Sequence, residues 1–214
     1  DYDRPGFEVL NFTSAASDVS DFAKNVLAYG GSDQCEDVYG GLCAAAKLQW
    51  SANVGSKLIF HICDAPCHGT FFAGQHSFVD YYKTTDSTGS QTQTVLRKLC
   101  GDLAAKYIFC KLNSSTDSMV ETYNRLLAGA NISAQIEQKS LTNAADIVTI
   151  TSTATIDSIS VSASQATSSI MENGVDDIAI YSSRLRSTVR THFSHHTLPD
   201  LPDDDDDDDA DDDD

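Results

Sequence analysis

Apolar positions along residues 7–136 change repeatedly between strand-like and helix-like spacing. Continuous or alternating apolar runs predict strands at 7–12, 57–63, 107–112 and 132–136. Apolar residues three and four positions apart predict helices over about 17–27, 36–49, 95–103 and 119–127. Because strands and helices alternate along the chain, we expect an α/β fold in which helices cover both faces of a mostly parallel sheet.

The remainder of the chain changes composition twice, which predicts a folded domain over 1–140 followed by two further segments. Residues 141–190 are rich in Ser, Thr and Ala. A stripe of Ile147, Ile150, Ala154 and Val161 favours a helix there, whereas the many hydroxyl side chains favour a loosely ordered linker. From residue 191 onward His and Asp dominate, so 191–214 is expected to be a disordered acidic tail.

Most of the negative charge lies at the end of the chain. Twelve aspartates between positions 200 and 214 account for most of the formal charge of −18, and subtracting them leaves −6 for the rest. No run of Lys and Arg accompanies this acidity, so nucleic acid is not an expected partner. No apolar run approaches the length of a membrane span.

The cysteines and the glycosylation sequons point to different compartments. Six cysteines lie at irregular spacing and mostly inside apolar stretches, which predicts buried free thiols. Sequons at Asn11, Asn113 and Asn131 are typical of secreted chains when they are used. The compartment stays open between the two, with the cytoplasm favoured over secretion.

Two short acidic loops are the candidates for a ligand site. In an open parallel sheet, ligands collect beyond the carboxyl ends of the strands. Asp64 follows the apolar run 57–63, and Asp33 lies in a glycine-rich loop that leads into the helix expected from residue 36. If these loops share one rim, Asp33, Asp64 and Ser32 offer hard oxygen ligands for Mg²⁺. A helix-capping role for Asp33 and a turn role for Asp64 are the simpler alternatives.

Three consecutive segments resemble the von Willebrand factor A domains found beside, or related to, alpha-type kinases. They are the glycine-rich stretch 30–42, Leu48-Gln-Trp50, and Ile62-Cys-Asp-Ala-Pro-Cys-His-Gly69. The segment from Asn113 to Met119 resembles a later part of the same subfamily, so the similarity covers roughly residues 1–124. It implies a three-layer α/β/α, Rossmann-like fold of the von Willebrand A type.

The resemblance also implies a protein-binding role through a metal-ion-dependent adhesion site. There a divalent cation such as Mg²⁺ completes its coordination with an acidic group of the partner protein. In this chain the resemblance assigns the cation to Asp64, Asp33 and Ser32, although many family members have threonine at the position of Asp33. The partner-binding rim that it implies comprises Gly31, Glu36, Pro66 and His68.

One part of the family pattern is absent from the sequence. The first metal motif, Asp-x-Ser-x-Ser, should follow an opening strand that would precede residue 1, so we expect an N-terminally incomplete domain with weak cation binding. Asp86-Ser-Thr-Gly-Ser90 imitates the spacing of that motif. It follows the polar Lys83-Thr-Thr rather than an apolar strand, so we interpret it as a surface turn.

Other functions were weighed against protein binding. Cys67 and His68 could form a nucleophile and base, but adjacent residues usually point apart and no orienting third group is evident, so we expect no enzyme. A zinc site from Cys63, Cys67 and His68 would lack a fourth ligand. His61, inside an apolar strand, is expected to be a core histidine with one hydrogen bond. The alternative function is an acidic tail that binds basic partners or Ca²⁺ while the folded part serves as a metal-free scaffold.

Overall fold

A computed structural model describes residues 7–27 and 33–173 of the chain. The chain divides into two compact units, 1–162 and 163–214, and the elements below belong to the first unit except for the last turns of α6. The acidic tail, Gly31 and Ser32 lie outside the described residues. Within the described residues, no helix is both long enough and apolar enough to cross a membrane.

Strands and helices alternate along the described chain, as the hydrophobic pattern predicts. In chain order the elements are α1 (Ala16–Asn25), α2 (Val38–Lys47), β1 (Leu58–Cys63), α3 (Thr70–Ala73), the 3-10 turn η1 (Gly74–Phe78), α4 (Ser90–Leu96), the π-helical turn η2 (Arg97–Asp102), β2 (Lys106–Lys111), the 3-10 turn η3 (Ser114–Thr116), α5 (Asp117–Gly129), β3 (Glu137–Ser140) and α6 (Ala144–Asn173). The α/β fold class is therefore confirmed.

The strands form one parallel sheet in the order β1-β2-β3. Ile59 pairs with Tyr107, and Phe109 pairs with Gln138, which fixes the register on both sides of β2. Parallel neighbours need a crossover between them, and each crossover here contains helix: α3 to η2 between β1 and β2, then η3 and α5 between β2 and β3. All three strands consequently end at the same edge of the sheet.

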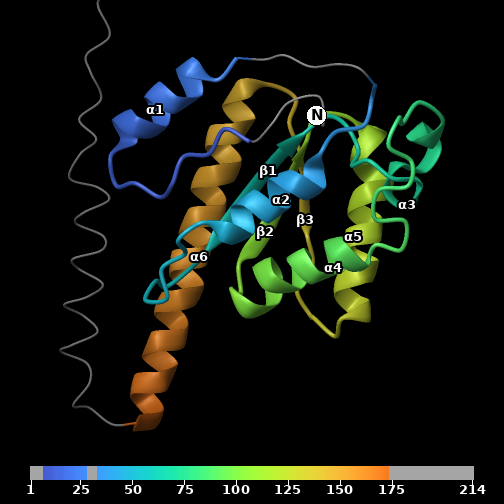
Figure 1. The fold of residues 1–214 in the computed structure, drawn as a ribbon. Helices are drawn as coiled ribbons and strands as arrows, with labels where there is room; N and C mark the ends of the chain where they lie inside the picture. The colour runs from blue at the N-terminus through green and yellow to red at the C-terminus, as the bar shows by residue number, and fades with distance from the viewer. Residues whose placement is uncertain (1–6, 28–32, 174–214) are drawn as a thin grey trace, which may run out of the picture. The chain divides into compact units, whose positions relative to one another are not determined.

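Helices cover both faces of the central strand β2. Alternate residues of a strand point to opposite faces, so Tyr107 and Phe109 pack on one side while Ile108 and Cys110 pack on the other. The first side meets buried residues of α2, α4, η2 and α5: Val38, Leu42, Leu96, Leu99, Met119, Val120, Tyr123 and Leu127. The second side meets the amino-terminal half of α6, which gives three layers (Figure 1).

The Ser- and Thr-rich segment after β3 is helical, and its hydroxyl groups bond within the helix. Thr151 Oγ1 donates to the Ile147 carbonyl and Thr155 Oγ1 donates to the Thr151 carbonyl, each at 2.7 Å. The apolar stripe expected from the sequence supplies the packing, since Ile147, Ile150 and Ala154 lie against β2. Val161, the last residue of that stripe, is 56% exposed.

Two predicted strands are wrong. Residues 7–12 form no strand, and Phe12 instead packs edge-on against Trp50 with ring centroids 5.0 Å apart. The strand predicted at 132–136 begins only at Glu137, where polar residues pair with β2 at the edge of the sheet. In both places backbone pairing, which the hydrophobic pattern does not report, decides whether a strand forms.

His61 makes the hydrogen bond expected from its place in an apolar strand, although the residue is half-buried rather than part of the core. Its Nδ1 atom lies 2.7 Å from the hydroxyl oxygen of Tyr107 on the neighbouring strand, and its ring packs edge-on against Phe109. Burial lowers the pKa of His61 from 6.5 to about 4, because a charged imidazole would lose its hydration there. The neutral ring is therefore the form that the folded chain contains.

Acid should destabilise the fold through His61. Between pH 6.5 and pH 4 the unfolded chain binds a proton at this residue that the folded chain does not, so the free energy of unfolding falls as the pH falls. The loss at low pH should reach up to about 3 kcal/mol. Urea denaturation across this range should show a shallower pH slope for His61→Gln than for the wild type. Parallel slopes would contradict this assignment.

The sequence that imitates the metal motif is a turn that caps α4. The carboxylate of Asp86 accepts hydrogen bonds from the backbone N–H groups of Gln91 and Thr92 at 3.1 and 2.7 Å. The chain closes on itself because Gly89 N–H donates to the Asp86 carbonyl at 2.8 Å. Asp86 is buried and has a φ of 40°, which aspartate tolerates better than most residues, whereas Ser87 and Thr88 are exposed.

Removing this cap should destabilise the protein by about 1 to 2 kcal/mol, because two buried N–H groups at the start of α4 lose their acceptor. We expect that loss for Asp86→Ala in chemical denaturation. Asp86→Asn should lose part of that stability, because its amide oxygen can replace only one of the two carboxylate oxygens that accept from Gln91 and Thr92. An Asp86→Ala variant as stable as the wild type would show that the carboxylate is not acting as a cap.

Candidate functional site: a rim of loops above a buried cluster

The two acidic loops singled out in the sequence lie side by side. Glu36 and Cys67 form a parallel β-bridge outside the named strands. Glu36 N–H donates to the Pro66 carbonyl at 2.9 Å, and His68 N–H donates to the Glu36 carbonyl at 3.1 Å. The loop that leads into α2 is therefore fixed against the loop that follows β1.

The loop after β2 joins the loop after β1. The carbonyl oxygen of Asp64 accepts hydrogen bonds from Asn113 Nδ2 at 2.9 Å and from Ser115 Oγ at 2.6 Å. Leu112 N–H donates to the Cys63 carbonyl at 3.1 Å. We call the exposed residues at this carboxyl edge of the sheet the rim: Asp64, Leu112, Asn113 and Ser114.

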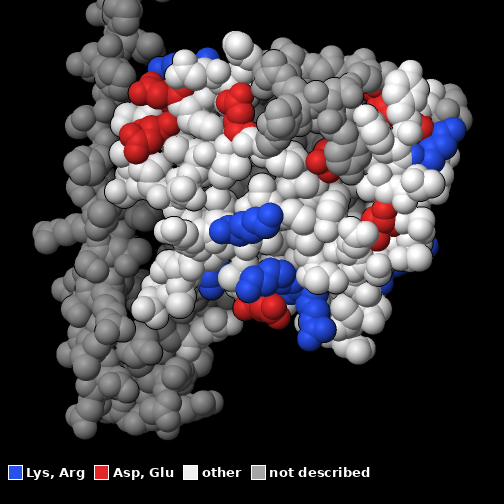
Figure 2. All heavy atoms as spheres, in the orientation of Figure 1, with Lys and Arg blue, Asp and Glu red and all other residues white. Residues whose placement is uncertain are grey.

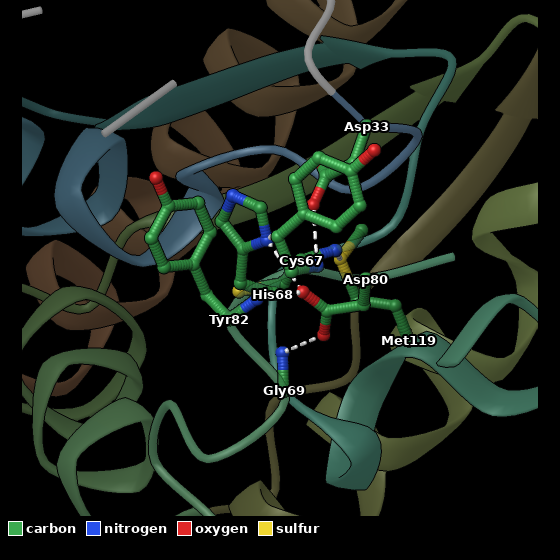
Figure 3. Close-up of polar contacts among 8 residues, drawn as sticks. Asp33, Cys67, His68, Gly69, Asp80, Tyr82 and Met119 are labelled. Carbon is green, nitrogen blue, oxygen red and sulfur yellow. Dashed lines mark hydrogen bonds and ion pairs between the residues drawn. The ribbon is translucent and has the colours of Figure 1, made fainter. Parts of the chain in front are cut away.

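Below the bridged loops lies a buried polar cluster that contains Asp33, Cys35, His68 and Asp80. His68 Nδ1 donates to Asp80 Oδ1 at 2.9 Å and lies 3.9 Å from Asp33 Oδ2 (Figure 3). The side chains of His68 and Asp80 are completely buried, and that of Asp33 is 1% exposed. Cys35 has no exposed surface. The cluster thus brings together residues from three segments that are far apart in the sequence.

Backbone N–H groups hold both carboxylates in place. Asp80 accepts from Gly69 N at 2.7 Å and from Tyr82 N at 2.8 Å, while Asp33 Oδ2 accepts from Tyr81 N at 2.6 Å. Asp33 Oδ1 is also buried, and it has no hydrogen-bond partner among the residues that the structure describes. One carboxylate oxygen of the cluster is therefore unsatisfied.

The donor atoms of the cluster could hold a metal ion. One sulfur, nitrogen or oxygen atom from each of Cys35, His68 and Asp80 lies within 4.8 Å of the others. Burial raises the pKa of the Cys35 thiol to about 12, and the negative charges of Asp80 and Asp33 add to that effect. Without a cation the thiol is therefore protonated and inert at neutral pH.

The residues expected to bind Mg²⁺ differ in how deeply they are buried and in the residues that they contact. Asp33 belongs to the buried cluster, whereas the side chain of Asp64 is exposed at the rim. Of the expected partner-binding residues, Glu36 forms the bridge between the loops, while Pro66 and His68 are buried and do not face solvent. Gly31 and Ser32 lie outside the described part of the chain.

The sequence reasoning missed two members of the cluster. Cys35 stands two positions from Asp33, a spacing that could have drawn attention to it, but Asp80 is a single acid between Phe78-Val79 and Tyr81-Tyr82, with no motif or period to mark it. The zinc site weighed for Cys63, Cys67 and His68 does not assemble. Cys63 Sγ donates to the Ala65 carbonyl at 3.0 Å, and Cys67 N–H points to the sulfur of Met119 at 3.1 Å. All six cysteines are free thiols.

Charges of both signs are mixed on the face of the molecule that Figure 2 shows. At the sheet edge, Glu137 pairs with Lys106 at 3.0 Å and with Lys139 at 2.6 Å. At the carboxyl end of β2, Lys111 pairs with Asp117 at 2.6 Å. These lysines are held by acidic neighbours within the sheet and at the start of α5, so they are not grouped into a separate basic surface.

The chain is similar to part of one kinase. Over 117 residues it is 30% identical to the alpha-protein kinase vwkA of Dictyostelium discoideum, which is 54% of this chain and 18% of that protein. The chain thus spans about a fifth of the length of this curated relative. No protein-family profile matches the sequence, and no solved structure matches it.

The Cys67 thiol should react slowly with an alkylating reagent in the folded protein, whereas a catalytic cysteine would react fast. It is fully buried, and burial raises its pKa to about 12, so almost no thiolate is present at neutral pH. Timed alkylation followed by peptide mass spectrometry should modify the half-buried Cys43 before Cys67. In denaturant the two should react at similar rates. If Cys67 were alkylated faster than Cys43 in the folded protein, the result would favour an enzymatic role for Cys67.

Proposed function

We propose that this chain is a protein-interaction module rather than an enzyme, and that it binds its partner on the rim. The similarity to a kinase named vwkA agrees with the resemblance to kinase-associated von Willebrand A domains, which are binding modules. The observation that carries the proposal is the convergence of three loops at the carboxyl edge of a parallel sheet, where such folds collect ligands.

The rim has the composition of a small protein contact. Leu112 is 51% exposed, and its backbone N–H bonds to the carbonyl of Cys63, the residue before the exposed Asp64. An apolar side chain surrounded by polar groups is typical of a binding surface on a soluble domain. Hydrogen bonds from Asn113 and Ser115 hold the backbone of Asp64, so little conformational entropy is lost when a partner binds.

Partner binding at the rim should depend less on a cation than the family resemblance implies. Mg²⁺ at the rim would draw on Asp64, because the carboxylate of Asp33 is buried beside a thiol and an imidazole. Mg²⁺ prefers several oxygen ligands, so we expect it to bind the rim weakly. A partner that presents Lys or Arg beside an apolar side chain fits the rim directly, whereas a partner carboxylate would require the cation.

The rim proposal can be tested by comparing the proteins that different variants capture. The full chain, Asp64→Ala, Asp102→Ala and a chain ending at residue 199 would each be immobilised and incubated with an extract of the source organism. Asp102 is an exposed acid before β2, at the other end of the sheet, so Asp102→Ala makes the same charge change away from the rim. Partners would be quantified by mass spectrometry with Mg²⁺ and with chelator.

We expect Asp64→Ala to reduce capture of specific partners at least about tenfold, since truncating a central contact often costs 1–2 kcal/mol or more. Asp102→Ala and the shortened chain should capture the same partners as the full chain. Loss of capture only on shortening, with steep weakening by salt, would instead assign binding to the aspartate tail. Loss with chelator would show that the cation is required.

A further inference from the structure

The buried cluster contains more negative charge than its neighbours neutralise. Asp33 and Asp80 are both withdrawn from water, and among residues 7–27 and 33–173 no Lys or Arg pairs with either carboxylate. Among the described residues their basic neighbour is His68, a single imidazole beside two carboxylates. Buried carboxylates without a balancing charge are costly, so this arrangement favours an additional cation.

The atoms around His68 are also spaced for metal coordination. A tetrahedral zinc ion with bonds of about 2.0 Å to nitrogen or oxygen and about 2.3 Å to sulfur holds its ligand atoms roughly 3.3 to 3.8 Å apart. The ligand atoms of Cys35, His68 and Asp80 lie within 4.8 Å of one another, and His68 Nδ1 faces Asp80 Oδ1 at 2.9 Å. Asp33 lies outside that group of three, with its Oδ2 atom 3.9 Å from His68 Nδ1. Shifts on the order of 1 Å would bring them to coordination distance.

The chemical types of the donor atoms favour one metal ion over another. Cys35 supplies sulfur, His68 nitrogen and Asp80 oxygen, a mixture that suits Zn²⁺ and is foreign to Mg²⁺, which takes oxygen ligands. The carboxylate of Asp33 is the candidate fourth donor, because its Oδ2 atom lies 3.9 Å from His68 Nδ1 and its Oδ1 atom is buried without a partner among the described residues. Backbone N–H groups from Gly69, Tyr81 and Tyr82 already donate to the two carboxylates and so orient them toward the ion.

We propose that Cys35, His68, Asp80 and Asp33 bind a structural Zn²⁺ ion that ties three segments together beneath the rim. The thiol loses its proton to solvent on coordination, and Zn²⁺ takes the place of the proton on His68 Nδ1, so the neutral ring carries its proton on Nε2 instead. With four protein ligands the site is closed, so its role is to fix the loops rather than to activate a water molecule.

The segments that the ion joins have little regular structure of their own. Cys35 lies in the loop before α2, His68 in the loop after β1, and Asp80 just after η1. Apart from the Glu36–Cys67 bridge, they are held by isolated backbone and side-chain hydrogen bonds. A metal ion that binds only the folded arrangement stabilises it by mass action. The zinc site therefore sets the conformation of the loop from Asp64 to Gly69, whatever partner the rim binds.

Metal content alone would not test the proposal, because the histidines and aspartates near the end of the chain can also collect divalent ions. Co²⁺ gives a specific signal: tetrahedral coordination with a thiolate produces visible d–d bands and a sulfur-to-cobalt charge-transfer band in the near ultraviolet. The full chain, stripped of metal by chelator, would be titrated with Co²⁺ and then with Zn²⁺. We expect both bands at one equivalent of Co²⁺ and their loss as Zn²⁺ displaces it.

Single substitutions can identify the residues that bind the metal ion. Cys35→Ser should abolish the charge-transfer band, and Asp80→Asn should lower Zn²⁺ affinity in competition with a chromophoric chelator by more than about 100-fold, a larger loss than an outer-shell change produces. Cys43→Ser is the matched control, since it removes another thiol from the adjacent α2 and should leave the spectrum intact. Asp64→Ala should also keep the site, which separates this proposal from that for the rim.

The wild-type chain provides a test that does not depend on whether a variant folds. Zn²⁺ should raise its melting temperature and chelator should lower it, while Asp33→Asn, which keeps the shape of the side chain, should show a much smaller shift. A wild-type chain without a thiolate-to-cobalt band, or one whose band survives in folded Cys35→Ser, would overturn the proposal.

Discussion

The hydrogen bond between His68 and Asp80 lies at the point where the loops of this fold are joined. It is fully buried, so its strength is not diluted by water, and its partners cannot be removed without leaving an unsatisfied polar group. His68 belongs to the loop after β1, and its backbone N–H is bonded to the loop before α2. The arrangement of the rim above therefore depends on a contact that solvent does not reach.

The sheet explains why this contact forms where it does. Parallel strands end at a common edge, so the loops after β1 and β2 must emerge together, and their carbonyl groups there need partners. Asn113 and Ser115 satisfy the carbonyl of Asp64, and Glu36 pairs with the loop after β1. Tyr107 and Phe109 anchor β2 in the larger core below, which gives these loops a rigid base.

Binding and metal coordination are divided between two levels of the same edge. Exposed oxygen and apolar groups lie at the rim, while the sulfur, nitrogen and carboxylate donors lie beneath it, out of contact with solvent. This division gives different roles to Asp64 and Asp33, the two aspartates that the family resemblance assigns to one cation site. Asp64 is available to a partner protein, whereas Asp33 is committed to the interior, where its negative charge requires compensation.

The hydrophobic pattern was sufficient for the α/β class, the parallel sheet and the helices α1, α2, α4 and α5, because burying apolar residues at a fixed period demands one secondary structure. It also placed Asp33 and Asp64 in two loops at the same edge. It failed for residues 7–12 and for the position of β3, where pairing of the backbone rather than side-chain periodicity decides the outcome. Only the tertiary structure brought Cys35 and Asp80 to His68, because that proximity arises from how three separate segments pack and leaves no spacing in the sequence.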